Sequence, residues 1–188
     1  MLIIKPIIKQ SPDMPLYKAL YQEAFPPSER KPMRMLFAGP KWASVQFNAY
    51  YDGDTFVGFS QAVTCGGLTY VAYLAVVNTG RGKGYGRQIL SLIRKSHEDS
   101  RIFLNMEIED DTAPNAEQRR KRRLFYLKND YTPTGLNMTI SGNTLELVVT
   151  NGTCTIDEIR GFFRRYWGFL WSKLLKIKVW EVSSCNVI

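Results

Sequence analysis

The chain has 188 residues, 45% of them hydrophobic and 22% charged, which suffices for one domain with a substantial core and excludes a disordered chain. Its net charge of +8 favours attraction to polyanions but does not decide the fold. The three cysteines, Cys65, Cys154 and Cys185, show no close metal-ligand spacing. We therefore expect reduced thiols in a cytoplasmic protein, no metal site and no membrane span.

The first half of the chain predicts mainly strands. Its opening apolar run is broken by Lys5 and Pro6, so it indicates a strand rather than a signal peptide. Asp52-Gly53-Asp54 predicts a hairpin turn between two β-rich runs, and Gly66-Gly67 turns the chain into a third. The predicted elements are a strand at 2–8, helices at 16–25 and 32–37, and strands at 44–51, 55–64 and 68–77.

The second half alternates helix, strand and helix before a closing hairpin. We expect a helix after the glycines at 82–86, a strand at 102–108, a second helix, and strands at 135–140 and 144–149 around Ser141-Gly142-Asn143. The predicted fold class is α/β, a mixed and mostly antiparallel central sheet flanked by helices.

An amphipathic helix is predicted at 155–177, opened by a capping box of Thr155 and Glu158. Its apolar side carries Ile156, Ile159, Phe163, Tyr166, Leu170, Leu174 and Ile177. Its basic side carries Arg160, Arg164, Arg165, Lys173 and Lys176, and Trp167 and Trp171 lie in the same stretch. We expect it to pack on the sheet, although a membrane surface or a partner is an alternative. The predicted division is a domain at 1–150 and a helical extension at 151–188.

The stretch Arg81-Gly82-Lys83-Gly84-Tyr85-Gly86-Arg87 lies between a predicted strand and a predicted helix. In that setting backbone amides and the helix dipole favour a phosphate, and glycines keep side chains out of its way. An ordinary turn with solvated bases is the alternative. The stretch matches neither the P-loop nor the dinucleotide-binding pattern.

What it does match is the acyl-CoA signature Arg/Gln-x-x-Gly-x-Gly/Ala, with Arg81, Gly84 and Gly86 in place. The chain here resembles the GNAT superfamily of N-acyltransferases. Downstream, the segment 124–131, Leu-Phe-Tyr-Leu-Lys-Asn-Asp-Tyr, is similar to the family's Leu-Tyr-x-x-x-Gly-Phe segment and places Tyr126 on its tyrosine. The resemblance covers residues 44–150 and implies the GNAT fold.

The chain departs from the family pattern at four positions. Asp130 replaces the usual glycine, and Tyr131 replaces the usual phenylalanine. Arg119 and Arg122 occupy positions where the family often has asparagine and alanine. No cofactor contact is carried over to those two arginines.

The resemblance implies a role for each matched segment. Leu74, Ala75 and Val76 would lie beside the pantetheine arm of acetyl-CoA, and residues 82–87 would hold its pyrophosphate. Tyr126 would act as the general acid for the leaving thiolate, with a packed core aromatic as the alternative. A backbone amide of Val76 or Val77 would stabilise the oxyanion.

The base is less determined. Glu107 and Glu109 project from the same face of the predicted strand at 102–108, and either could take a proton from the substrate ammonium through water. The same acidic run could instead only attract a cation. Glu29 is a substrate-binding candidate, because the segment before the second strand often lines the acceptor pocket in the family.

These observations predict an N-acetyltransferase that moves an acetyl group from acetyl-CoA to a primary amine on a small molecule or peptide by direct attack. A covalent cysteine route is disfavoured, because no cysteine lies in a matched segment. Two other functions stay open: a nucleic-acid-binding protein that uses the basic run at 119–123, and a non-catalytic acyl-CoA-binding scaffold. We expect no nucleic-acid partner, and a homodimer is left open.

Overall fold

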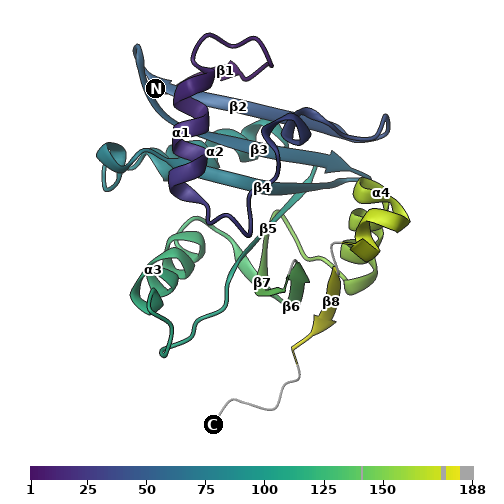
Figure 1. Cartoon of the computed structure of the whole chain (residues 1–188). Helices are drawn as coiled ribbons and strands as arrows, with labels where there is room; N and C mark the ends of the chain where they lie inside the picture. Colours follow the sequence, from purple (N-terminus) through teal and green to yellow (C-terminus); the bar gives the residue numbers. More distant parts are fainter. Residues whose placement is uncertain (141, 175–176, 183–188) are drawn as a thin grey trace. The chain divides into compact units, whose positions relative to one another are not determined.

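A computed structural model of the chain describes residues 1–140, 142–174 and 177–182, with the backbone alone for 168–174 (Figure 1). The elements of the first half are β1 (Ile3–Pro6), α1 (Met14–Ala24), the 3₁₀ helix η1 (Met33–Phe37), β2 (Ser44–Asp52), β3 (Thr55–Cys65), β4 (Leu68–Val76), the 3₁₀ turn η2 (Asn78–Gly80) and α2 (Tyr85–Ser96). Those of the second half are β5 (Arg101–Glu107), α3 (Ala116–Leu127), β6 (Thr132–Ile140), β7 (Asn143–Thr150), α4 (Ile156–Leu174) and β8 (Lys178–Glu181).

The chain divides into two compact units. The first comprises residues 1–65 and 69–99, and the second comprises residues 66–68 and 100–188. These units are not the predicted domains, which meet at residue 150. The domain boundary therefore stays a prediction. Each unit has its own strands, helices and core.

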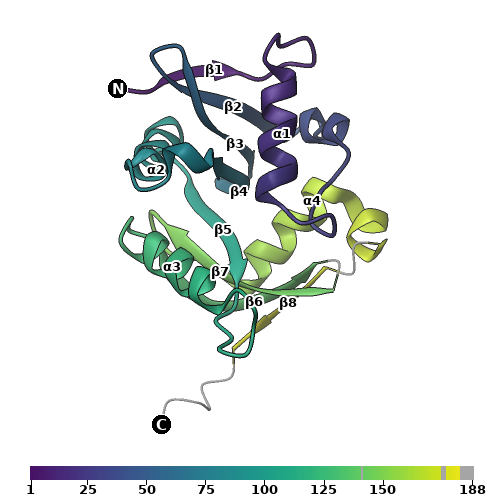
Figure 2. The same cartoon turned by 60° about the vertical axis from the view of Figure 1, so that its left-hand side comes forward.

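In the first unit the strands follow the order β1-β2-β3-β4, and β1–β2 and β2–β3 are antiparallel. Helices α1 and α2 lie on opposite faces of these strands (Figure 2). All residues of β3 and β4 except Thr55 are buried or half-buried, which agrees with coverage on both faces. The α1 face is strongly aromatic: Tyr21 packs on Phe59 and Tyr73 with ring centroids 6.3 and 5.2 Å apart. Such rings supply much of the buried apolar surface.

A register shift in β3 brings the β3 backbone close to β4. Tyr50 pairs with Gly58 whereas Tyr51 pairs with Phe56, so Val57 is an extra residue in β3, which is the geometry of a β-bulge. A Cβ on Gly58 would lie 2.4 Å from the carbonyl oxygen of Ala75 in β4. Glycine is therefore required at this crossing of the two backbones.

In the second unit the strand order is β5-β7-β6-β8, and each neighbouring pair is antiparallel. Helices α3 and α4 lie on opposite sides of these strands (Figure 2). Phe162 and Phe163 of α4 pack edge-on against Phe103 of β5. The Arg101 guanidinium in β5 also pairs with Glu158 at 2.7 Å, so both apolar and ionic contacts attach α4 to the strands.

The structure confirms the predicted fold class, and most element bounds agree within one or two residues. The capping box is confirmed too: the Glu158 amide donates to Thr155 Oγ1 at 3.3 Å, and the Thr155 amide donates to the Glu158 carboxylate at 2.9 Å. The sequence does not predict strand β8, whose four residues lie in the predicted C-terminal helical extension.

Some predictions concern parts of the chain outside the described residues. They are those on Ser141, on Cys185 and on the side chains of Leu170, Trp171, Lys173, Leu174 and Lys176. Over the ranges that are described, none of the helices combines the length and the apolar composition needed to cross a membrane.

Replacing Gly58 with alanine tests the close crossing of β3 and β4. The added methyl must displace the Ala75–Val76 backbone, so we expect Gly58→Ala to lower the free energy of unfolding by about 1–3 kcal/mol in urea denaturation. Gly161→Ala is the matched control: a Cβ there meets nothing within 4 Å inside α4, so the variant should gain about 0.5–1 kcal/mol. Equal stability of the two variants would contradict the crossing.

Candidate active site

The glycine-rich segment forms an open bend before α2. Gly82 and Gly84 have φ angles of +79° and +80°, which favour glycine. A Cβ built on either residue meets no atom within 4 Å, so the space above the bend is empty of protein. A ligand can therefore approach this backbone closely.

The first turn of α2 leaves its amides without partners. The first hydrogen bond of the helix runs from the Gln88 amide to the Gly84 carbonyl at 3.1 Å, and Gly84 supplies no side-chain cap. Within the described part of the chain, nothing accepts a hydrogen bond from the amides of Tyr85, Gly86 and Arg87. Arg81, Lys83 and Arg87 are exposed around them. Unpaired amides, a helix dipole and cations together make a site for a polyanion.

Contacts beneath the bend hold it in place. Gly80 is buried against the Tyr85 ring, where an added Cβ would lie 2.9 Å from a ring carbon. The Tyr85 hydroxyl donates to Asp52 at 2.7 Å, so the predicted cofactor contact of Tyr85 is left to its backbone amide. Ile89 and Ile93 anchor the following helix in the core.

Strand β4 places Leu74, Ala75 and Val76 next to this bend in sequence. Ala75 is buried together with Tyr73 in the aromatic cluster, whereas Leu74 and Val76 alternate to the other face and are half-buried. The Val77 amide donates to the Val57 carbonyl at 3.0 Å. Amides alternate along a strand, so the Val76 amide points away from β3. Of the two predicted oxyanion donors, Val76 is the one whose amide is not bound by β3.

Tyr126 lies at the C-terminal end of α3 in the second unit. Its ring is buried beside Phe125 and Tyr131, with centroids 5.2 and 5.8 Å away. No described residue forms a hydrogen bond with its hydroxyl. Burial raises the pKa of Tyr126 above its usual value, and the Arg122 guanidinium offsets only part of that shift. The hydroxyl is thus protonated near neutral pH and is able to donate.

Asp130, which replaces the glycine of the family pattern, has a backbone conformation that favours glycine. Its φ of +64° is left-handed, a conformation that Asp adopts more readily than most residues. The Tyr131 amide donates to the Tyr126 carbonyl at 3.2 Å and closes α3. The substitution therefore leaves the turn after Tyr126 intact.

The two carboxylates proposed as base occupy different surroundings. Strand β5 ends at Glu107, so Glu109 lies beyond it and is exposed; the prediction that both share one face of a strand is corrected on this point. Glu107 accepts a hydrogen bond from Asn115 Nδ2 at 2.9 Å and forms ion pairs with Arg119 and Arg122. Glu107 thus ties β5 to α3.

In the first unit, the carbonyl oxygen of Glu29 accepts a hydrogen bond from the Tyr73 hydroxyl at 2.9 Å. That contact places the Glu29 segment against β4 at Tyr73, the residue that directly precedes Leu74.

The basic run at 119–123 is engaged by carboxylates, which the sequence did not reveal. The ion pairs are Arg119–Glu107, Arg120–Asp111, Arg120–Glu117, Lys121–Glu117, Arg122–Glu107 and Arg123–Glu146. These partners come from the preceding loop, from α3 itself, and from β5 and β7. Each of the five cations in the run therefore has a carboxylate partner.

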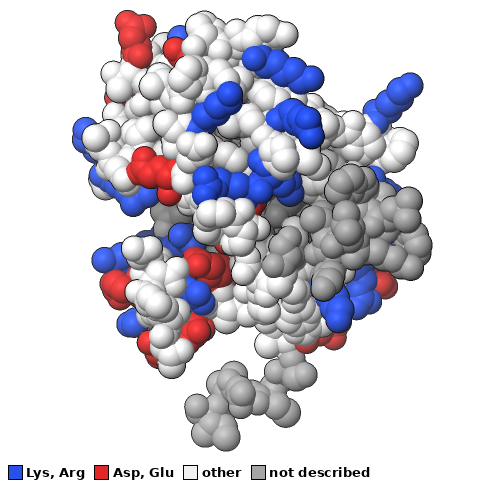
Figure 3. Space-filling model, viewed as in Figure 1, with Lys and Arg blue, Asp and Glu red and all other residues white. Residues whose placement is uncertain are grey.

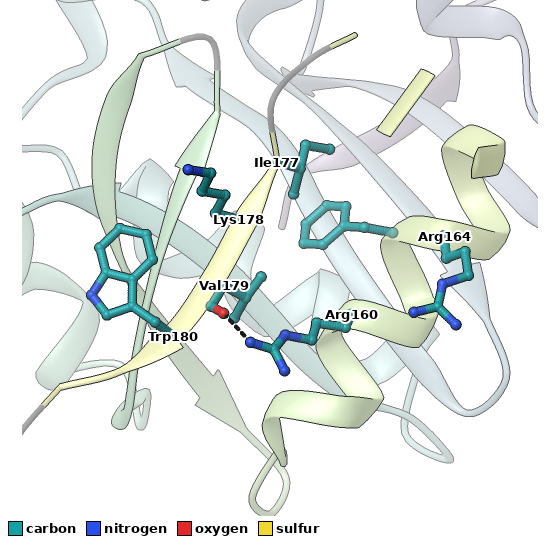
Figure 4. Close-up of a pocket in the computed structure, with 7 residues that line it drawn as sticks. Arg160, Arg164, Ile177, Lys178, Val179 and Trp180 are labelled. Carbon is teal, nitrogen blue, oxygen red and sulfur yellow. Dashed lines mark hydrogen bonds between the residues drawn. The ribbon is translucent and has the colours of Figure 1, made fainter. Parts of the chain in front are cut away.

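Two pockets have no residue of the glycine-rich bend in their lining. One of about 580 Å³ lies between α4 and β8 in the second unit, lined by Arg160, Phe163, Arg164, Ile177, Lys178, Val179 and Trp180 (Figure 4). There the Arg160 guanidinium donates to the Val179 carbonyl at 2.7 Å, and none of the predicted site residues lines the pocket. The other pocket, of about 550 Å³, lies between α1 and the segment that follows it in the first unit.

Cys65 and Cys154 are free and buried, and burial raises the pKa of Cys154 to about 11. A thiol held protonated in this way is a poor nucleophile. In the part of the chain open to description, no three His, Cys, Asp or Glu side chains group as metal ligands would.

Comparison with known proteins agrees with the geometry. Residues 43–133 match the acetyltransferase (GNAT) domain family. No curated protein matches the chain in sequence. Among solved structures, one assigned as a GNAT-family acetyltransferase from Bacteroides thetaiotaomicron superposes with a TM-score of 0.68 at 19% identity, covering 94% of this chain and 99% of that one.

Two further structures are similar. The ribosomal-protein-S18-alanine N-acetyltransferase from Escherichia coli gives a TM-score of 0.55 at 13% identity, with coverage of 82% and 96% of the two chains. An aminoglycoside 6'-N-acetyltransferase complexed with coenzyme A gives 0.56 at 17% identity, with coverage of 79% and 96%. The family match and these likenesses in fold lead to one conclusion: the chain contains an acetyltransferase (GNAT) domain at residues 43–133 and has the GNAT fold.

Proposed function

We propose that the protein transfers an acetyl group from acetyl-CoA directly to a primary amine. One observation carries this proposal: the amides of Tyr85, Gly86 and Arg87 have no hydrogen-bond partner among the described residues. The space beside the preceding Gly84 is also open, because a Cβ built there would meet no atom within 4 Å. Three exposed cations flank them. These are the properties that a diphosphate requires of a protein.

The residues present fit coenzyme A in charge and in shape. The bend from Gly82 to Arg87 would bind the diphosphate through amides, and Arg81, Lys83 and Arg87 would neutralise it. Leu74 and Val76, half-buried on β4, would contact the pantetheine arm. Acetyl-CoA bound in this way supplies the thioester that an amine attacks.

Two groups of the chain suit the chemistry that follows. The Val76 amide, turned away from β3, would stabilise the negative charge that develops on the carbonyl oxygen. Tyr126 would donate its proton to the departing thiolate, because its hydroxyl has no described partner and burial keeps it protonated. Strand β4 and Tyr126 belong to different units. We therefore also propose that the two units come together to form one site.

The acceptor is a primary amine of a small molecule or a peptide. The two similar enzymes carry names that refer to acceptors as different as an alanine of a ribosomal protein and an aminoglycoside, so the fold does not select one. Glu29 stays a candidate for acceptor binding. A cytoplasmic location stays a prediction, and a homodimer stays an open alternative.

A thiol-release assay with acetyl-CoA across amine classes tests the proposal. We expect acetyl-CoA to bind and at least one class of amine to release coenzyme A. Tight binding without release from any amine would support the non-catalytic scaffold. Absence of acetyl-CoA binding, with salt-sensitive binding to an oligonucleotide, would favour the nucleic-acid function instead.

Removing the Tyr126 hydroxyl tests the general acid. We expect Tyr126→Phe to lower kcat by about 100-fold, the range of general-acid catalysis, with acetyl-CoA affinity changed less than about twofold. Stopped-flow thiol release and calorimetry measure the two quantities. An unchanged release rate at every pH would show that Tyr126 only packs α3.

Glu107 and Glu109 offer a matched pair for the base. We expect Glu107→Gln to lower the free energy of unfolding by about 1 kcal/mol, because Arg119 and Arg122 lose their carboxylate, while Glu109→Gln stays within about 0.5 kcal/mol. The variant that removes the acidic limb of the pH–rate profile identifies the base. If neither changes that limb, both carboxylates are excluded as base.

A further inference from the structure

The pocket between α4 and β8 encloses about 580 Å³, which is in the range of small-molecule sites. All of its lining residues belong to the second unit. Both elements follow residues 43–133, so the pocket lies in the part of the chain beyond the matched acetyltransferase domain. Figure 3 shows basic side chains, with acidic ones beside them, on the surface where α4 and β8 lie, at the lower right of that view.

The floor of this pocket is apolar. Phe163 of α4 and Val179 of β8 are buried, and Ile177 is half-buried beside them. In Figure 4 the Ile177 side chain is turned toward α4, whereas Lys178 and Trp180 project from the other face of β8. An apolar ligand surface can therefore pack between the helix and the strand.

The α4 side of the pocket carries two guanidinium groups. Arg160 and Arg164 are four residues apart, so they lie on one face of the helix, one turn apart, and both are exposed. Among the described residues neither forms an ion pair, because the nearby carboxylate of Glu158 pairs with Arg101 at 2.7 Å. The described lining contains no carboxylate. This wall therefore has two positive charges that no described side chain compensates.

Strand β8 adds a backbone donor to the same pocket. It is the last strand in the order of the sheet, and it pairs with β6. The Val182 amide donates to the Gly135 carbonyl of β6 at 2.8 Å, and amides alternate along a strand, so the Val179 amide points away from β6. No described group accepts a hydrogen bond from it. The Val179 carbonyl already accepts one from Arg160 at 2.7 Å, so this edge offers a donor.

We propose that this pocket binds a small organic anion that has a carboxylate or phosphate group on an apolar body. The anionic group would bind Arg160, Arg164 and the Val179 amide, because a guanidinium fork matches two oxygens of such a group. The apolar body would pack on Phe163 and Ile177. The inference is independent of the proposed acetyl transfer, since the glycine-rich bend contributes no residue to this lining.

Calorimetric titration of the full chain with four probes tests the inference. We expect phenylacetate or phenyl phosphate to bind with a Kd below about 1 mM, and the tighter of the two identifies the anionic group. Neutral 2-phenylacetamide and inorganic phosphate should each bind at least about ten-fold more weakly, because one lacks the charge and the other the apolar body. Absence of binding by both aromatic anions, or equal affinity for either control probe, would overturn the inference.

Arg164→Gln locates the site, because it removes one guanidinium and leaves the contact between Arg160 and Val179 in place. We expect it to weaken binding of the aromatic anion at least about ten-fold. Lys128→Gln is the matched control: Lys128 is an exposed cation of the same unit at the end of α3, outside the lining, so the affinity should change less than about twofold. Equal losses in the two variants, or displacement of the probe by coenzyme A, would contradict the assignment.

Hydrogen exchange at the Val179 amide gives an independent readout by NMR. At a probe concentration of ten times the Kd, about one chain in eleven is free, so exchange at this amide should slow about ten-fold. The same probe should leave exchange in the Arg164→Gln variant nearly unchanged. An unprotected Val179 amide in the parent chain would show that the anion does not bind the edge of β8.

Discussion

Unpaired backbone amides at the start of α2 are the constraint on which the account depends. An α-helix cannot satisfy its own first amides, and here neither a side-chain cap nor a neighbouring loop does so among the described residues. Gly82 and Gly84 keep this end of the helix open, and Arg81, Lys83 and Arg87 add positive charge. An arrangement that leaves three adjacent donors unpaired is stabilised when an anion binds.

Much of the first unit serves to hold that bend. The Tyr85 hydroxyl links the first residue of α2 to Asp52 at the end of β2, and Gly80 lets the bend lie against the Tyr85 ring. The bulge at Val57 and the glycine that follows it bring the β3 backbone against Ala75. Tyr73 of β4 also packs into the aromatic cluster under α1, which holds this strand in place. A rigid site of this kind loses little entropy when its ligand binds.

The sequence predicted the fold class and a glycine-rich bend before a helix, because those depend on local periodicity and on motifs contiguous in the chain. It did not predict what depends on tertiary contacts. The ion pairs of Arg119 and Arg122 with Glu107 join segments separated by a loop. The pattern of alternating residues also predicts Glu109 on the same strand face as Glu107, whereas β5 ends at Glu107. Asp130 could not be read as a glycine substitute until its φ was known.

Calorimetric titration with acetyl-CoA and with S-acetylpantetheine tests the central claim most directly. The two ligands share the thioester and the pantetheine arm, and only acetyl-CoA carries the diphosphate. If the amides of Tyr85, Gly86 and Arg87 bind that diphosphate, acetyl-CoA should bind at least about 100-fold more tightly, as two charge-assisted hydrogen bonds of about 1.5 kcal/mol each would give. Equal affinities would contradict the account.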